Sequence, residues 1–95
     1  MQTVYFDYNA TTPLDPKVRE AMLPFLGEVW GNPSSVHHVG RQARAQLDEA
    51  RERAARVLRC KPSEVVFTAG GTESANLAVF GAARRLKAKG RHLIT

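Results

Sequence analysis

The sequence predicts an α/β fold in which helices cover an incomplete parallel or mixed sheet. Residues 64–68 form a short β-branched and aromatic run, two glycines then allow a turn, and residues 72–89 carry a helical pattern. Another apolar segment, residues 92–95, follows. Strand, helix and strand in this order form a crossover unit, which belongs to a sheet with helices on its faces.

The predicted sheet is smaller than an independent domain requires. Sheets usually contain about four to six strands, whereas this sequence offers two candidates and a short third one at residues 3–6. We therefore expect either an N-terminal fragment or a chain that completes its sheet with another polypeptide. In this interpretation residues 1–14 are an N-terminal arm, and residues 15–95 begin a larger α/β domain.

Composition and charge narrow the classes of protein. The 95 residues are 43% hydrophobic and 24% charged, as in ordinary globular proteins. The single cysteine excludes an intramolecular disulfide framework and a CxxC metal site, and we find neither a signal-peptide pattern nor an apolar run long enough to span a membrane. We therefore expect a cytoplasmic protein without a membrane partner. The net charge of +5 leaves nucleic acid, an anionic cofactor and an acidic protein open as partners.

Capping residues and apolar periodicity predict two helices before the glycine turn. Asp15 and Pro16 are typical of an N-cap and a first helical position, and we expect Pro24 to end or kink that helix early. Residues 39–58 carry the longest apolar stripe, and their opposite face is rich in arginine. A solvated surface explains this face better than nucleic-acid binding does, because no aromatic residues are interleaved with the cations.

Two other groups of residues are weak candidates for a site. His37 and His38 are adjacent, so their side chains point apart, and no cysteine or carboxylate lies at ligand spacing; we expect no metal site. One of the two histidines is expected to form a cap or to contact a polar site, and the other to be solvated. Cys60 has no general base at a recognisable spacing, and we interpret it as a structural or incidental cysteine.

The glycine turn is the main candidate for a binding site. A helix start presents unpaired backbone N–H groups and the positive end of the helix dipole. Gly70 and Gly71 let the backbone approach a ligand without an intervening Cβ, and Thr72 is expected at the cap position with a hydroxyl donor. The pattern predicts an anion site suited to phosphate. The sequence contains neither a P-loop motif nor a GxGxxG motif.

Three motifs together resemble one protein family. They are Tyr-Phe-Asp-Tyr-Asn-Ala-Thr-Thr-Pro at residues 5–13, Gly-Asn-Pro-Ser-Ser-Val-His at residues 31–37, and Phe-Thr-Ala-Gly-Gly-Thr-Glu-Ser-Ala-Asn at residues 67–76. In order and spacing they resemble the opening part of cysteine desulfurases of the NifS/IscS type. The resemblance implies a homodimeric transferase of fold-type I that uses pyridoxal 5′-phosphate (PLP), of which this chain is the N-terminal part. Such enzymes take sulfur from L-cysteine and leave alanine and an enzyme persulfide, which feeds iron–sulfur cluster or thiolated tRNA synthesis.

The resemblance also implies roles for individual residues. Gly71 and Thr72 match residues that contact the cofactor phosphate, and residues 9–12 and 32–37 match loops near the active site. The family's Schiff-base lysine, ring-stacking histidine, aspartate partner of the pyridine nitrogen and persulfide cysteine have no counterpart in these residues. We therefore expect no catalytic residue in this chain and no desulfurase activity from it alone.

The expected partners are L-cysteine, a sulfur-acceptor or iron–sulfur scaffold protein and a second copy of the enzyme, without nucleic acid. Two alternatives stay open. Another enzyme of the same class V aminotransferase group, such as a selenocysteine lyase or an epimerase, would differ in an active-site loop that these residues do not include. A standalone basic module that binds an acidic partner or nucleic acid would show a steep salt dependence of binding and would fold cooperatively from 95 residues.

Overall fold

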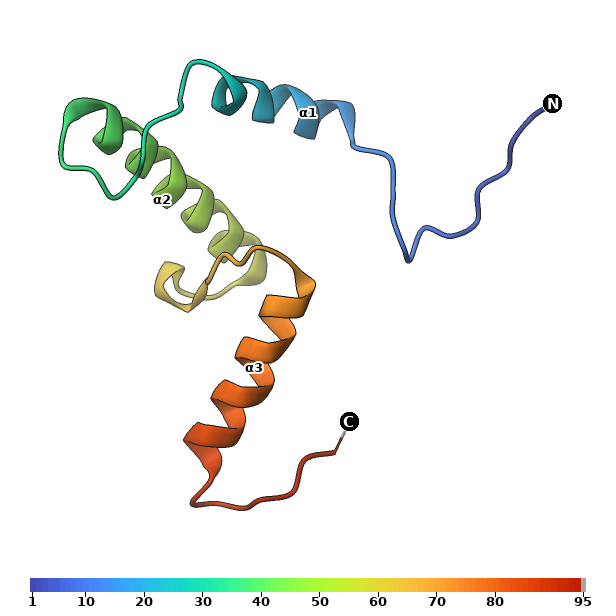
Figure 1. Cartoon of the computed structure of the whole chain (residues 1–95), viewed down its shortest axis with the longest axis vertical. Coiled ribbons are helices and arrows are strands. Elements are labelled where there is room, and N and C mark those ends of the chain that lie inside the picture. Colours follow the sequence, from blue (N-terminus) through green and yellow to red (C-terminus); the bar gives the residue numbers. More distant parts are fainter. Residues whose placement is uncertain (95) are drawn as a thin grey trace. The chain divides into compact units, whose positions relative to one another are not determined.

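The computed structural model describes residues 1–94, and this part of the chain contains three α-helices and two short 3-10 helices (Figure 1). The α-helices are α1 (Pro16–Met22), α2 (His38–Leu58) and α3 (Gly71–Leu86). The 3-10 helices are η1 (Leu23–Leu26) and η2 (Pro62–Glu64). By its contacts the chain divides into two compact units, Met1–Arg53 and Ala54–Thr95.

Helix α1 begins and ends where its capping residues predict. The Asp15 carboxylate accepts a hydrogen bond of 2.8 Å from the backbone N–H of Lys17. Pro16 occupies the first helical position, where a missing N–H leaves no helical hydrogen bond unmade. The α-helix ends at Met22, and Pro24 lies in η1 directly after it. The predicted early end of this helix is confirmed.

Helix α2 starts one residue before the predicted position and carries ion pairs on its exposed face. Arg44 and Arg51 both pair with Asp48, at 3.0 and 2.7 Å, and Arg53 pairs with Glu49. These side chains are partly exposed, so each pair contributes only about 0.2–1 kcal/mol to the stability. The arginine-rich face of α2 is therefore in large part neutralised by the acidic residues of the same helix.

The backbone of Cys60 takes part in the C-terminal cap of α2. Arg59 adopts a left-handed conformation with φ of 55°. The N–H of Cys60 donates to the carbonyl oxygen of Ala55 at 3.0 Å, and the N–H of Arg59 donates to that of Arg56 at 3.4 Å. These two bonds form a Schellman motif, which satisfies the last carbonyl groups of a helix. The backbone of Cys60 thus helps to end α2 beside Ala55, which is only 2% exposed.

Helix α3 begins at a different cap from the one predicted. Gly70, in an extended conformation with φ of 171°, is the N-cap, and Thr72 is the second helical residue. The helix starts there because the N–H of Ser74 bonds to the Gly70 carbonyl oxygen at 3.1 Å. The prediction that Thr72 caps the helix is therefore wrong, although Thr72 still lies in its first turn.

The C-terminal end of α3 also differs from the prediction. The helix ends at Leu86 instead of residue 89, and the N–H of Lys89 closes a tighter turn on the Leu86 carbonyl oxygen at 2.8 Å. Gly90 therefore lies beyond the helix end and is not its C′ residue. Gly90 also lacks the left-handed conformation of such a residue, since no glycine in residues 1–94 lies in the left-handed region.

The predicted strands are absent from residues 1–94. Glu64 belongs to η2, Val65 has extended backbone angles (φ −95°, ψ 120°), and residues 3–6 and 92–94 have no regular structure. Thr95 lies outside the described residues. A strand requires hydrogen bonds to a neighbouring strand, and the described part of this chain provides no such neighbour. The helices of the α/β prediction are confirmed, whereas its sheet stays a prediction.

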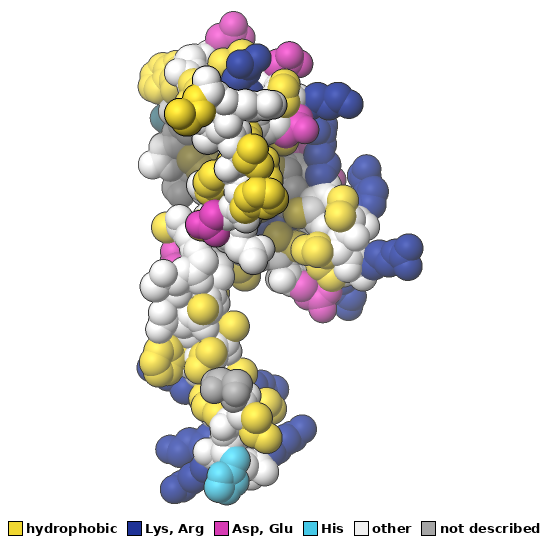
Figure 2. Space-filling model, turned by 90° about the vertical axis from the view of Figure 1, so that its right-hand side faces the viewer, with side chains coloured by type: hydrophobic (Ala, Val, Ile, Leu, Met, Phe, Trp, Pro, Cys, Tyr) yellow, Lys and Arg dark blue, Asp and Glu magenta, His cyan; other side chains and the backbone are white. Residues whose placement is uncertain are grey.

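Many apolar side chains lie at the surface. Phe6 is 90% exposed, Leu26 76% and Trp30 75%. Figure 2 shows several apolar side chains on one face of the protein. In residues 1–94 no helix is long and apolar enough to cross a membrane. Exposed apolar groups of this size usually mark surfaces that bind other protein.

Candidate functional site

The start of α3 brings Gly71 and Thr72 together with a row of backbone N–H groups. The first helical hydrogen bond runs from the N–H of Ser74 to the carbonyl oxygen of Gly70. The N–H groups of the three residues before Ser74 therefore have no acceptor within the helix, and they lie at the positive end of its dipole. This arrangement can bind an anion such as phosphate.

The two glycines leave this turn open. A Cβ added at Gly70 or at Gly71 would meet no atom within 4 Å. Neither glycine has a left-handed backbone, so the local conformation does not require glycine. A requirement for glycine at these two positions would therefore come from a bound group that approaches the backbone closely.

Side chains on both sides of the turn hold its shape. The Glu73 carboxylate accepts a hydrogen bond of 2.7 Å from the N–H of Ala69. The Thr68 hydroxyl donates to the Gly70 carbonyl oxygen at 3.2 Å and lies 2.6 Å from the Ser74 hydroxyl. The roles of these side chains were not predicted from the sequence. The available signal was an acidic residue in the first turn of a helix, where its carboxylate can reach back to free N–H groups.

A second polar element precedes α2 in the Met1–Arg53 unit. The Asn32 side-chain oxygen accepts a hydrogen bond of 2.9 Å from the N–H of Ser34. The backbone carbonyl oxygen of Asn32 accepts one of 3.0 Å from the N–H of Ser35. The His37 side chain caps the helix, because its Nδ1 accepts a hydrogen bond of 3.3 Å from the N–H of Gly40. The predicted histidine cap is thus confirmed, and the neighbouring histidine is exposed as expected.

Two glycines hold this loop against the start of α2. A Cβ at Gly31 would lie 2.3 Å from the carbonyl oxygen of Val39, and one at Gly40 would lie 2.3 Å from that of Ser35. Both distances are far below an ordinary contact, so no other residue fits without displacing backbone. The path of residues 31–37 is therefore set by the chain's own packing.

The N-terminal arm contains a turn at the polar residues 9–12. The N–H groups of Ala10 and Thr11 both donate to the Asp7 carbonyl oxygen, at 3.0 and 3.4 Å. The rings of Tyr5 and Tyr8 pack edge to face with their centroids 5.3 Å apart. Residues 9–12 are exposed, so their side chains are accessible to a ligand.

Comparison with known proteins identifies the family. Residues 4–95 match the class-V aminotransferases. The chain belongs to this family. It is 55% identical over 92 residues to the cysteine desulfurase IscS of Dictyoglomus turgidum, and 53% identical over 93 residues to the cysteine desulfurase IscS of Methylococcus capsulatus. The resemblance drawn from the three motifs is confirmed.

The similarity extends to a solved structure but to only part of each relative. The two curated alignments cover 97% of this chain and 23% of each relative, so the chain spans just under a quarter of their length. A NifS-like protein of known structure is similar with a TM-score of 0.84 and 42% identity, over 92% of this chain and 24% of that one. The match supports the predicted transferase fold at the level of the helices and turns described above.

Within this class-V aminotransferase chain the candidate residues belong to different units. Gly71 and Thr72 lie in the Ala54–Thr95 unit, whereas residues 9–12 and residues 32–37 lie in the Met1–Arg53 unit. Across residues 1–94, no three His, Cys, Asp or Glu side chains are grouped closely enough to hold a metal ion. The start of α3 is the candidate anion site that Gly71, Thr72 and the backbone N–H groups of its first turn suggest.

Proposed function

We propose that this chain forms the N-terminal part of a PLP-dependent cysteine desulfurase. The observation that supports this best is the open start of α3, where Gly71, Thr72 and backbone N–H groups without a helical acceptor would hold the cofactor phosphate. The family match and the two relatives named cysteine desulfurase support the same reaction. In this proposal sulfur leaves L-cysteine, and the products are alanine and an enzyme persulfide.

The residues at the start of α3 fit the phosphate of PLP. A phosphate dianion needs several hydrogen-bond donors and a positive potential, and a helix start supplies both. Gly71 would allow the phosphate to approach the backbone, and Thr72 would donate its hydroxyl. The carboxylate of Glu73 is already bonded to the Ala69 N–H, which holds it back on the turn. When bound, PLP supplies the electron sink for cleavage at the substrate amino acid.

The remaining machinery is proposed to lie outside these residues. The Schiff-base lysine, the pyridine-nitrogen partner and the persulfide cysteine expected for the family have no counterpart here, so we propose that the 95-residue chain alone is inactive. The complete enzyme would be a cytoplasmic homodimer that passes sulfur to an acceptor or scaffold protein. Exposed side chains such as Trp30 and Phe80, 75% and 57% exposed, offer surface for the rest of the enzyme to cover.

Thr72→Ala in the full-length protein tests this proposal. We expect PLP binding to weaken by roughly tenfold to a hundredfold, because a hydrogen bond to a charged group contributes about 1.5–3 kcal/mol. Thr72→Ser, which keeps the hydroxyl, should bind PLP almost as the parent protein does. The measurements are titration of the apoprotein with PLP, followed by absorbance, and the release of alanine from L-cysteine. Equal PLP affinity in both variants would show that Thr72 does not hold the phosphate, and conversion of L-selenocysteine alone would favour the lyase alternative.

A further inference from the structure

We propose that the side-chain hydroxyl of Thr68 positions the backbone N–H of Gly71 for the cofactor phosphate. The inference rests on the proposed function, since it concerns the same site at the start of α3. Thr68 is a positioning residue and would not touch the cofactor itself. It acts through the peptide group that joins Gly70 to Gly71, which has no Cβ on either side.

The carbonyl oxygen of Gly70 and the N–H of Gly71 belong to one planar peptide group. Residues 1–94 contain no cis peptide bond, so this group is trans. In a trans peptide group the C=O and N–H bonds point in opposite directions. The Gly70 carbonyl oxygen accepts the first hydrogen bond of α3 and points into the helix, so the N–H of Gly71 points out of the helix start. A group that holds this oxygen therefore also fixes the direction of the Gly71 N–H.

Two hydroxyl groups form a chain of hydrogen bonds that ends on this oxygen. The Thr68 hydroxyl donates to the Gly70 carbonyl oxygen at 3.2 Å and lies 2.6 Å from the Ser74 hydroxyl. Because a hydroxyl has a single hydrogen, Thr68 does not donate to both, and Ser74 is the donor to Thr68. The N–H of Ser74 also donates to the Gly70 carbonyl oxygen, at 3.1 Å. Both lone pairs of that oxygen are thus engaged.

The peptide group between the two glycines needs such support. No atom lies within 4 Å of a Cβ position at Gly70 or Gly71, and glycine loses more conformational freedom on ordering than any other residue. A rotated peptide group would turn the Gly70 carbonyl oxygen, an acceptor, toward the phosphate. By preventing this rotation before the ligand arrives, Thr68 would lower the entropy lost on binding. Unlike the carboxylate of Glu73, the two hydroxyls are uncharged, so they affect the cofactor through the shape of the turn alone.

Binding of PLP and of pyridoxal, which lacks the phosphate, to the full-length apoprotein tests this role by absorbance. Thr68→Val replaces the hydroxyl with a methyl group, and PLP affinity should fall about threefold to tenfold, as for the loss of one hydrogen bond. Pyridoxal affinity should stay that of the parent, because no phosphate meets the Gly71 N–H. Thr68→Ser, which keeps the hydroxyl, should bind both ligands as the parent does. Thr3→Val makes the same chemical change at an exposed threonine of the N-terminal arm and is the matched control.

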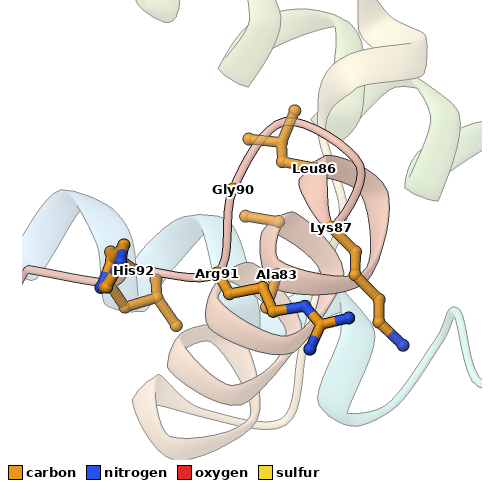
Figure 3. A pocket seen from close by; sticks show the side chains of 8 residues that line it. Ala83, Leu86, Lys87, Gly90, Arg91 and His92 are labelled. Carbon is orange, nitrogen blue, oxygen red and sulfur yellow. The ribbon is translucent and has the colours of Figure 1, made fainter.

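Two further variants separate the hydrogen-bond chain from other causes. Ser74→Ala should weaken PLP binding less than Thr68→Val does, and should add little to it in the double variant, because both hydroxyls act in one chain. Lys87 and Arg91, at the other end of α3 (Figure 3), would attract the phosphate by charge alone. If these cations held PLP, Lys87→Gln with Arg91→Gln would weaken its binding; we expect the affinity of the parent.

The outcomes for this inference and for the proposed function are distinguishable. Loss of PLP affinity in Thr72→Ala with none in Thr68→Val would overturn the inference and leave the proposed function intact. A parent protein that binds no PLP would overturn both. Equal losses of PLP and pyridoxal affinity in Thr68→Val would mean that this side chain only supports the fold, which also overturns the inference. If Thr68→Val melts at a lower temperature, the ratio of PLP to pyridoxal affinity in Ser74→Ala repeats the test with a smaller change.

Discussion

Two pairs of glycines in this chain differ in the space available to a Cβ atom. Gly31 and Gly40, at the loop before α2, approach backbone atoms so closely that a Cβ would lie 2.3 Å from a carbonyl oxygen. Gly70 and Gly71, at the start of α3, have no atom within 4 Å of the position of a Cβ. The first pair is required by the packing of the chain itself. The second pair has no such requirement, and a bound phosphate would provide one.

This difference separates residues that shape the chain from residues that serve a ligand. Substitution at the first pair should change the stability of the protein, whereas substitution at the second should change cofactor affinity and leave stability nearly unchanged. Gly31, Gly70 and Gly71 all lie within motifs that resemble the cysteine desulfurases, so the motifs alone do not distinguish the two roles. The space around each glycine does.

The largest expected effect is that of Gly40→Ala on stability. The added methyl group would lie 2.3 Å from the Ser35 carbonyl oxygen and 2.8 Å from that of Asn32, so backbone must move. Because overpacking of this kind destabilises proteins, we expect a loss of about 3 kcal/mol in the free energy of unfolding. Denaturant unfolding of the full-length protein measures this loss. Gly27→Ala, where no atom lies within 4 Å, is the matched control and should change stability by less than about 0.5 kcal/mol.

The outcome for Gly40→Ala decides whether close packing constrains the loop before α2. A large loss in Gly40→Ala with none in Gly27→Ala would establish that close packing holds the loop. Equal stability of the two variants would mean that the loop moves freely to admit a methyl group, and its glycines would then be no more constrained than Gly70 and Gly71.

Gly71→Ala is expected to have a smaller effect, and on a different quantity. The new methyl group finds open space in the protein, so the apoprotein should unfold at the same denaturant concentration as the parent. It would obstruct a phosphate at the helix start, and we expect PLP affinity to fall roughly tenfold, equivalent to about 1.4 kcal/mol. Titration of the apoprotein with PLP measures the affinity. A loss of stability without a loss of affinity would reverse the roles assigned to the two glycine pairs.

Local interactions are the part of this fold that sequence reasoning predicted well. Asp15 and Pro16 define the start of α1 through contacts within one turn, and the apolar period of residues 39–58 gave α2 to within one residue. The cap of α3 was misplaced for a local reason as well. Threonine is a good N-cap, but Gly70 takes that position while Thr68, Glu73 and Ser74 bond around it.

Features that depend on distant atoms could not be predicted in the same way. The strands need a neighbouring strand, and residues 1–94 contain none. The close approach of Gly40 to Ser35 depends on the three-dimensional path of the loop, which no sequence period records. For the candidate site, the sequence predicted an anion at the glycine turn, whereas the hydrogen bond from Ala69 to Glu73 emerged only from the structure.

The smallest effect concerns that hydrogen bond. Glu73→Ala removes the acceptor of the Ala69 N–H, which lies 2.7 Å from the carboxylate, and should lower the free energy of unfolding by about 1 kcal/mol, as loss of a helix cap does. Glu52→Ala is the control, because Glu52 is an exposed acidic residue within α2. Thermal unfolding of the apoprotein compares the two variants. The Glu73 substitution also removes a negative charge near the proposed phosphate site, so a destabilised variant that binds PLP at least as tightly as the parent is expected. Weaker PLP binding in Glu73→Ala would show instead that the shape of the turn, which this carboxylate holds, matters more to the cofactor than the charge does.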